Sequence, residues 1–204
     1  MSYQQLIAIV APPVLIGTMT LVFRYAARRF GDRTGWFVGL VSYWLLWGVA
    51  YSFLLVGSTN VLLSMYPKRP DLASLALAGA PVVFAASGRF WFGARYEKNS
   101  GLEGVALLVT ALGNGFFEEI LWRGTYLVLF PSNFIFGIAW PSLCFGAWHY
   151  APVSISNRGN RTRIIRLMVG AVILGIALSL AAFRTGTIFW SIISHTLAGI
   201  VLVL

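Results

Sequence analysis

The chain alternates between long apolar stretches and short polar connections along its whole length. A helix needs about 20 apolar residues to cross the hydrocarbon core of a bilayer, and several stretches approach that length. The candidate spans are seven, at residues 4–23, 36–58, 72–88, 103–130, 133–150, 165–183 and 187–204. The third contains Pro81 and the fourth is interrupted by Gly113-Asn114-Gly115, so the pattern is compatible with six to eight spans. We predict an all-α, polytopic transmembrane helix bundle that forms a single integral membrane domain over residues 1–204.

The basic residues between these stretches predict an orientation. Cytoplasmic loops of membrane proteins carry an excess of Lys and Arg. With the N-terminus outside, eleven basic residues are cytoplasmic, namely Arg24, Arg28, Arg29, Arg33, Arg89, Arg95, Lys98, Arg158, Arg161, Arg163 and Arg166. Three are external, namely Lys68, Arg69 and Arg184. This distribution favours seven spans with the N-terminus outside and the C-terminus inside, and the short loops favour a multi-pass protein of a prokaryotic cytoplasmic membrane.

Composition supports the same class of protein. Of the 204 residues, 58% are hydrophobic and only 10% are charged, and the mean hydropathy is +0.79. Soluble domains carry about 25% charged residues, so most of this surface is expected to face lipid. The net charge of +9 would suggest nucleic-acid binding in a soluble protein. Here the basic residues are divided among loops and are expected to contact anionic lipid headgroups, which argues against a nucleic-acid partner.

Two adjacent glutamates and an arginine interrupt the fourth apolar stretch. Each ionisable group at bilayer depth costs about 2.5–3.5 kcal/mol on insertion scales, so Glu118, Glu119 and Arg123 must be paired, protonated or functional. Glu119 and Arg123 have the i, i+4 spacing of a helical ion pair. Glu118 is rotated about 100° from Glu119 and shares its face with Asn114. A carboxyl group without a partner charge at this depth suits a general base, although a structural ion pair beside a protonated Glu118 would also explain the pattern.

The two histidines of the chain, His149 and His195, both lie in apolar stretches. A lone histidine in a membrane helix is usually a hydrogen-bonding partner for a neighbouring helix. Two histidines and two carboxylates at similar depth instead favour a shared site.

These residues resemble the motifs of a known family over about residues 103–199. Glu118-Glu119-x-x-x-Arg123 resembles the EExxxR motif of the CPBP intramembrane proteases, also called the CAAX-protease or Abi family, which includes the Ras-converting endopeptidase. Phe145-x-x-x-His149 resembles the second motif of the family, FxxxH. Arg184-Thr185-Gly186 followed by His195 resembles the region of the third motif.

The resemblance implies an intramembrane endopeptidase that acts without a metal or another cofactor on a membrane-anchored protein or peptide. Glu118 and His149 would activate a water molecule, and His195 would stabilise the oxyanion. Glu119 and Arg123 would orient the site, with Phe145 in a supporting position. The sequence leaves the substrate and the oligomeric state open.

One position departs from the family pattern. The family often has Asn four residues after the third-motif histidine, as a second oxyanion donor, and this chain has Gly199 there. Loss of one such donor typically lowers the rate by about 10²–10³. Asn114 and Ser191, one turn before His195, are the candidate substitutes.

Other functions remain open at this point. Two histidines and a glutamate could bind zinc with an open position, although no HExxH pair is present. A non-catalytic scaffold or immunity-type protein could retain the same fold, and a transporter could use the carboxylates as a proton relay. Cys144, the single cysteine, is expected to be a small buried residue rather than a nucleophile.

Overall fold

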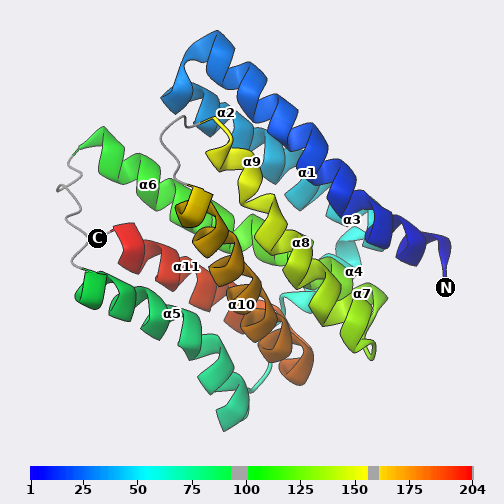
Figure 1. Ribbon diagram of the computed structural model, residues 1–204. Helices are drawn as coiled ribbons and strands as arrows, with labels where there is room; N and C mark the ends of the chain where they lie inside the picture. Colours follow the sequence, from blue (N-terminus) through cyan, green and yellow to red (C-terminus); the bar gives the residue numbers. More distant parts are fainter. Residues whose placement is uncertain (93–100, 156–160, 204) are drawn as a thin grey trace.

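The computed structural model describes residues 1–92, 101–155 and 161–203, and within these residues it is helical and contains no strand (Figure 1). In chain order, with α for α-helical and η for π-helical segments, the elements are α1 (Tyr3–Phe30), α2 (Asp32–Tyr43), η1 (Trp44–Tyr51), α3 (Ser52–Val56), α4 (Ser58–Ser64), α5 (Leu72–Phe92), α6 (Leu102–Gly113), η2 (Asn114–Glu118), η3 (Ile120–Gly124), α7 (Thr125–Leu129), η4 (Ile135–Ala139), α8 (Trp140–Trp148), α9 (Tyr150–Val153), α10 (Arg161–Thr185) and α11 (Phe189–Val203).

All seven predicted segments are helical. Four continuous helical stretches are long and apolar enough to cross a bilayer, namely Tyr3–Phe30, Asp32–Val56, Glu103–Leu129 and Arg161–Thr185. Leu72–Ser87 and Phe189–Leu202 are shorter apolar helices, and the remaining predicted segment forms η4 and α8. The prediction of an all-α helical membrane bundle is therefore confirmed. The number of crossings and the orientation stay predictions, and Arg95, Lys98 and Arg158, on which the orientation partly rests, lie outside the described residues.

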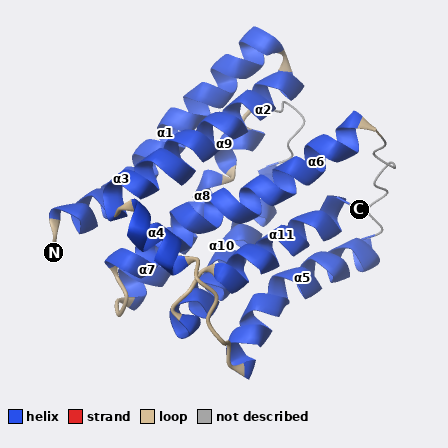
Figure 2. Ribbon diagram, turned by 180° about the vertical axis from the view of Figure 1, so that it is seen from behind, coloured by secondary structure: helices blue, strands red, loops and turns tan. Residues whose placement is uncertain are grey.

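The helices form a bundle with two flanks, and the EExxxR and FxxxH motifs lie on the helices between them. The α1 and α2 helices pack against each other on one flank, and α5 and α11 pack together on the other (Figures 1 and 2). Between them lie the continuous α6–η2–η3–α7 rod and α8, while α10 contacts both α8 and α5. The chain begins beside the end of α7, where the Gln5 amide donates to the Leu129 carbonyl, and α11 ends beside the start of α6. The two ends of the chain thus lie at opposite ends of the bundle (Figure 1).

Glycines allow the helices to approach closely at the crossings that build the site. A Cβ at Gly115 on η2 would lie only 2.8 Å from the Cα of Thr196 on α11. A Cβ at Gly146 on α8 would lie 2.8 Å from the Met168 carbonyl oxygen on α10. Small residues at helix crossings are the usual means by which membrane helices bring their backbones together. These two contacts hold α11, which carries His195, against η2, and hold α10 against α8, which carries Phe145.

The α1–α2 hairpin is also defined by glycine. Gly31 joins the two helices with φ of 82°, a left-handed conformation that glycine adopts without steric cost. Gly35, one turn into α2, is pressed against the backbone of Ala26 and Ala27 on α1, where a Cβ would overlap main-chain atoms. The start of α2 is therefore fixed in position against α1.

Large aromatic side chains fill the centre of the bundle. Trp122, Trp148, Tyr43 and Phe145 are each at most 1% exposed. Many aliphatic and aromatic side chains on the outer faces are exposed instead, including Leu54 at 85% and Phe84 at 74%. Apolar exposure on this scale agrees with a surface covered by lipid.

Candidate active site

The EExxxR motif lies in an irregular part of its helix. The sequence interruption at Gly113-Asn114-Gly115 does not break the rod; the hydrogen-bonding pattern changes there from α to π, in η2 and again in η3. π-helical turns are rare and occur frequently at functional sites. Glu118 closes η2 and Glu119 follows it, so both carboxylates project from the widened turns.

Glu119, Arg123 and His195 form a polar cluster in which Glu119 and Arg123 are fully buried and His195 is partly buried. Nη1 of Arg123 lies 3.0 Å from Oε1 of Glu119, which is the ion pair expected from the i, i+4 spacing. Nδ1 of His195 lies 2.8 Å from the same oxygen. Glu119 and Arg123 are 0% and 1% exposed, so neither charge is screened by water. The carboxylate of Glu119 therefore links the motif helix to α11.

Glu118 is held by a different set of groups. Its Oε1 accepts a hydrogen bond of 3.0 Å from the indole N–H of Trp148, and Trp148 stacks on Tyr43 with ring centroids 3.8 Å apart. The Tyr43 hydroxyl in turn accepts a hydrogen bond of 2.8 Å from Trp122. The second carboxylate oxygen, Oε2, has no hydrogen-bond partner among the described residues and lies 3.8 Å from Nε2 of His195. One oxygen of Glu118 is thus fixed and the other faces an imidazole.

Phe145, the first residue of the FxxxH motif, lies in contact with both histidines and with Arg123. Its ring meets the imidazoles of His149 and His195 edge to face, at centroid distances of 4.8 and 5.9 Å. The guanidinium carbon of Arg123 lies 4.4 Å from the same ring centroid, a distance typical of a cation–π contact. The Phe145 side chain is completely buried and has no polar atom, so the ring positions its neighbours by packing.

His149 has a defined tautomer. Its Nδ1 lies 2.8 Å from the Phe145 carbonyl oxygen, one turn back along α8. A carbonyl only accepts, so Nδ1 must carry the hydrogen. In neutral His149 the other nitrogen, Nε2, is then an acceptor.

Both histidines line one cavity of about 470 Å³. Asn114 and Thr110 are the other polar lining residues, and Gly199 also borders the space. The remaining walls are apolar and come from the helices α2, α5, α6, α10 and α11, through Trp36, Pro81, Phe84, Ala85, Leu107, Ala111, Leu167, Gly170, Ala171, Leu174, Ala198 and Leu202. Glu118 does not line the cavity; it lies next to it, against the imidazole of His195.

Asn114 and Ser191, the two candidate substitutes for the missing asparagine, lie in different surroundings. Asn114 lines the cavity, and its Oδ1 accepts a hydrogen bond of 3.0 Å from the indole N–H of Trp44. Ser191 is fully buried, and its hydroxyl donates to the Leu178 carbonyl on α10 at 3.0 Å. Asn114 is therefore placed at the cavity with the two histidines, whereas Ser191 lies in the contact between α10 and α11.

Sequence reasoning missed the two aromatic residues that hold Glu118, Trp148 and Tyr43. Trp148 immediately precedes His149, and an indole N–H beside a motif histidine at bilayer depth is itself a signal, because it must find an acceptor. Tyr43 lies 75 residues before Glu118 in the chain, and nothing in the local sequence relates the two residues. Cys144 is buried and does not line the cavity.

The described part of the chain contains no group of three or more His, Cys, Asp or Glu side chains arranged to hold a metal ion. Nδ1 of His149 and Nδ1 of His195 are already occupied by a carbonyl and by a carboxylate, which leaves only the Nε2 atoms as ligands.

The fold and the cluster define a class: a helical membrane protein with a buried glutamate–histidine centre beside an apolar cavity. The family model described as type II CAAX prenyl endopeptidase Rce1-like matches residues 99–201, about half of the chain, and these residues include all of the motif positions. The chain belongs to this family of CAAX-protease-type membrane peptidases. No curated protein and no solved structure matches the chain significantly.

Proposed function

We propose that this protein is an intramembrane endopeptidase that hydrolyses a peptide bond of a membrane-anchored substrate with a water molecule activated by Glu118 and His149, without a metal. The observation that carries the proposal is the position of Glu118, whose free oxygen lies 3.8 Å from Nε2 of His195 beside a cavity lined by both histidines. Polar groups at this separation can both bind one bridging water molecule. The substrate carbonyl would lie in the cavity.

His149 supplies an acceptor for the proton of that water. Its Nδ1–H donates a hydrogen bond to the Phe145 carbonyl. The unprotonated Nε2 of neutral His149 therefore points away from its own helix. A second-sphere hydrogen bond of this kind fixes the orientation and the tautomer of an imidazole. Glu118 and His149 would therefore share the proton that leaves the water as it attacks, and later return it to the leaving amine.

His195 would stabilise the oxyanion, and this role places a condition on its protonation. Nδ1 of His195 contacts the Glu119 carboxylate at 2.8 Å, so Nδ1 carries a hydrogen. Nε2 can donate to an oxyanion only when it is protonated as well. A carboxylate beside Nδ1 would compensate the positive charge of a doubly protonated ring, so we assign the second motif glutamate the role of a positioning residue for His195. Nη1 of Arg123 lies 3.0 Å from the same oxygen, so Glu119 lies between a guanidinium and the imidazole.

The shape of the cavity favours a substrate with an apolar anchor. A slot of about 240 Å³ between α5 and α10 shares Pro81, Phe84, Gly170 and Leu174 with the catalytic cavity. All of its lining residues are apolar or glycine, and Phe84 and Ile173 are 74% and 65% exposed on the outer surface. The family description names prenylated CAAX substrates. We therefore propose a lipidated peptide, whose chain would reach the cavity from the bilayer through this slot.

The test is cleavage of a farnesylated CAAX-type peptide by the purified protein in lipid nanodiscs. Glu118→Gln and His149→Ala should each abolish cleavage while leaving the thermal unfolding of the protein nearly unchanged. Asp71→Asn, a carboxylate change at the far end of the bundle, is the control and should cleave normally. Full activity of Glu118→Gln, or complete loss of wild-type activity with a zinc chelator, would contradict the mechanism.

A further inference from the structure

A second cavity adjoins the catalytic one and has a different chemical character. It has a volume of about 590 Å³ and lies between the first turns of α2 and α6 and the short helix α9. Its lining includes three charged residues, Asp32, Arg33 and Glu103, together with Trp36 and Phe37. Here we call this cavity the vestibule. The catalytic cavity, in contrast, has no Asp, Glu, Lys or Arg among its lining residues.

The vestibule and the catalytic cavity meet at Trp36 and Leu107, which are the two residues that line both. Along α6 the lining residues follow one helical face, from Glu103 and Ala106 in the vestibule, through Leu107, to Thr110 and Asn114 in the catalytic cavity. At 1.5 Å per residue, the distance from Glu103 to Asn114 is about 16 Å. The lining residues of the two cavities therefore form one row along this face of the helix, with polar residues at both ends.

Trp36 stands at the junction on a fixed backbone. The preceding residue, Gly35, is pressed against the main chain of α1, so α2 has no freedom to move at this point without separating from α1. The Trp36 ring is half-buried and meets the neighbouring Phe37 ring edge to face at 5.2 Å. Phe37 lines only the vestibule, which makes it a natural comparison.

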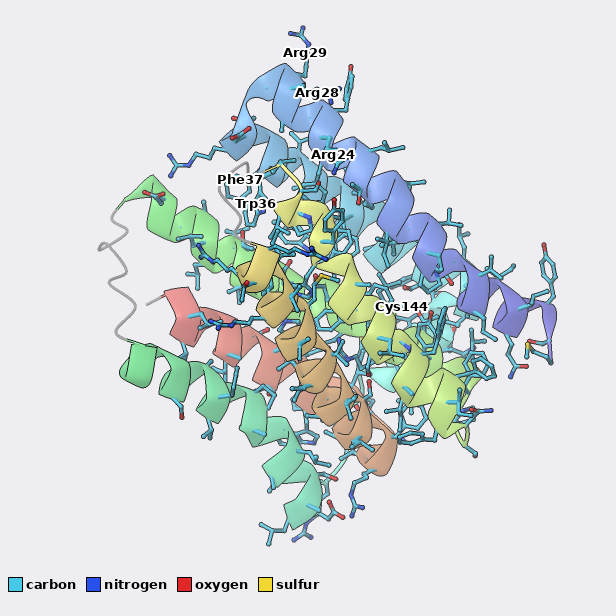
Figure 3. The ribbon with its side chains drawn as sticks, viewed as in Figure 1. Arg24, Arg28, Arg29, Trp36, Phe37 and Cys144 are labelled. Atoms are coloured by element: carbon cyan, nitrogen blue, oxygen red, sulfur yellow. The ribbon has the colours of Figure 1, made fainter. Side chains whose placement is uncertain are left out.

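The end of the bundle that holds the vestibule carries both basic and acidic side chains. Arg24, Arg28 and Arg29 lie at the end of α1 near Trp36 and Phe37 (Figure 3). The side chains of Arg33 and Glu103, 70% and 51% exposed, form an ion pair that joins α2 to α6 at the vestibule. This end is the cytoplasmic side in the predicted orientation, so the vestibule opens where the soluble part of a membrane-anchored substrate would be found.

We propose that the vestibule receives the peptide part of the substrate and that Trp36 is the residue past which the peptide reaches the two histidines. The inference rests on the proposed function for the identity of the substrate. The apolar anchor has an apolar slot between α5 and α10, and the polar main chain of the peptide needs a path lined by hydrogen-bonding groups. The vestibule supplies those groups, and the Trp36 side chain lies where the vestibule meets the catalytic cavity. Trp36 is thus a positioning and specificity-determining residue, and it takes no part in the chemistry.

The separation of the vestibule from the catalytic cavity by Trp36 can be measured without any cleavage. Cys144 is the single cysteine, so a Cys144→Ala protein is a background for Ala106→Cys in the vestibule and Thr110→Cys one turn further, in the catalytic cavity. The probe is a charged methanethiosulfonate reagent applied to the protein in nanodiscs. We expect Thr110→Cys to react about tenfold more slowly than Ala106→Cys, because a thiol reacts only where water and the reagent reach it.

Trp36→Ala should then raise the reaction rate of Thr110→Cys to near that of Ala106→Cys, whereas Phe37→Ala should leave it unchanged. If Trp36→Ala does not fold, Trp36→Leu provides the same comparison with a side chain that still fills part of the space. Equal rates for the two cysteines with Trp36 present, or the same acceleration by Phe37→Ala, would overturn the role of Trp36.

The occupant is tested by protection of the same cysteines in a Glu118→Gln background. A farnesylated CAAX-type peptide should slow the modification of Ala106→Cys, and farnesol without a peptide should not. Protection of Ala106→Cys by farnesol alone, or by nanodiscs of anionic lipid without a peptide, would overturn the assignment of the vestibule to the peptide. Because none of these readouts depends on cleavage, their failure is distinct from a failure of the proposed hydrolysis.

Discussion

Nδ1 of His195 lies 2.8 Å from Oε1 of Glu119, and the two residues come from helices far apart in the chain. The contact is buried and is reinforced by Arg123, whose guanidinium lies 3.0 Å from the same oxygen. Breaking a buried ion pair by removal of one partner typically costs about 3–5 kcal/mol, because the other charge is left without compensation. The stability of the fold and the position of the His195 ring therefore depend on the same carboxylate.

Glu119→Gln should separate these two effects. The amide oxygen can still accept from Nδ1 of His195, but the negative charge that stabilises the imidazolium is lost, and we expect kcat to fall by about 10²-fold or more. The protein should also be less stable by about 3–5 kcal/mol because Arg123 is left unpaired. The double variant Glu119→Gln/Arg123→Met should recover the stability but not kcat. Thermal unfolding and initial rates on the farnesylated peptide measure both; recovery of kcat in the double variant would show that Glu119 acts only through the fold.

The hydrogen bond from Trp148 to Glu118 gives a second prediction. Trp148→Phe retains an aromatic ring against Tyr43 but leaves Oε1 of Glu118 without its donor, which should cost about 1–3 kcal/mol. Because the carboxylate is no longer fixed, kcat should fall by about tenfold with little change in KM. Trp122→Phe removes a comparable indole donor, the one to the Tyr43 hydroxyl, and is the matched control. Equal losses of kcat in the two variants would mean that Trp148 acts through packing alone.

The sequence predicted those parts of the site that depend on residue type and local spacing. The contact of Glu119 with Arg123 follows from the i, i+4 spacing. The placement of His149 and His195 at one cavity agrees with the cost of ionisable groups at bilayer depth, and their catalytic roles stay predictions. The helical segments follow from hydropathy because every backbone polar group in lipid must be satisfied within the segment.

What the sequence could not predict depends on contacts between distant segments. The stacking of Tyr43 on Trp148, which orients Glu118, depends on how α2 crosses α8. The contact between Gly115 and Thr196 depends on the rotation of α11, and a glycine in an apolar stretch does not reveal which helix it faces. The π-helical turns at Asn114 replace the expected interruption for the same reason, since neighbouring helices decide whether a Gly-Asn-Gly sequence breaks or widens a helix.

Asn114 and Ser191 should differ sharply in their effect on activity. The indole of Trp44 is a donor only, so it binds the oxygen of Asn114 and leaves the amide hydrogens free to donate at the cavity. Asn114→Ala should therefore lower kcat by about 10²–10³-fold, the usual effect of removing one oxyanion donor. Ser191→Ala removes a hydroxyl that is committed to the Leu178 carbonyl, and should cost about 1 kcal/mol of stability with nearly normal kcat. Normal cleavage by Asn114→Ala would exclude it as the substitute donor.

The close packing around Gly199 makes an asparagine difficult to accommodate at this position. A Cβ there would lie 3.0 Å from the Cβ of Ala111 on α6, closer than almost all real contacts of this kind. Gly199→Asn should therefore destabilise the protein by about 1–3 kcal/mol through overpacking. The double variant Ala111→Gly/Gly199→Asn should recover stability, and in the Asn114→Ala background it should restore part of the lost kcat. If the added asparagine restores nothing in a stable protein, the position does not face the oxyanion in this chain.

The slot between α5 and α10 is tested most sharply at Gly170, because a Cβ at that position has no atom within 4 Å. Gly170→Leu should fill the slot from inside without forcing the helices apart. A leucine side chain occupies space that a lipid chain would otherwise take, so we expect KM to rise by about tenfold or more for a farnesylated peptide and to change less for a peptide with a shorter lipid chain.

The control is Gly17→Leu, since Gly17 also lies in a long helix with nothing within 4 Å of an added Cβ, but far from the slot. Gly17→Leu should leave KM unchanged for both peptides, and both variants should unfold at temperatures near that of the wild type. An equal rise in KM for the two lipid lengths would indicate that the slot does not hold the lipid chain, and the anchor would then have to reach the catalytic cavity by another path.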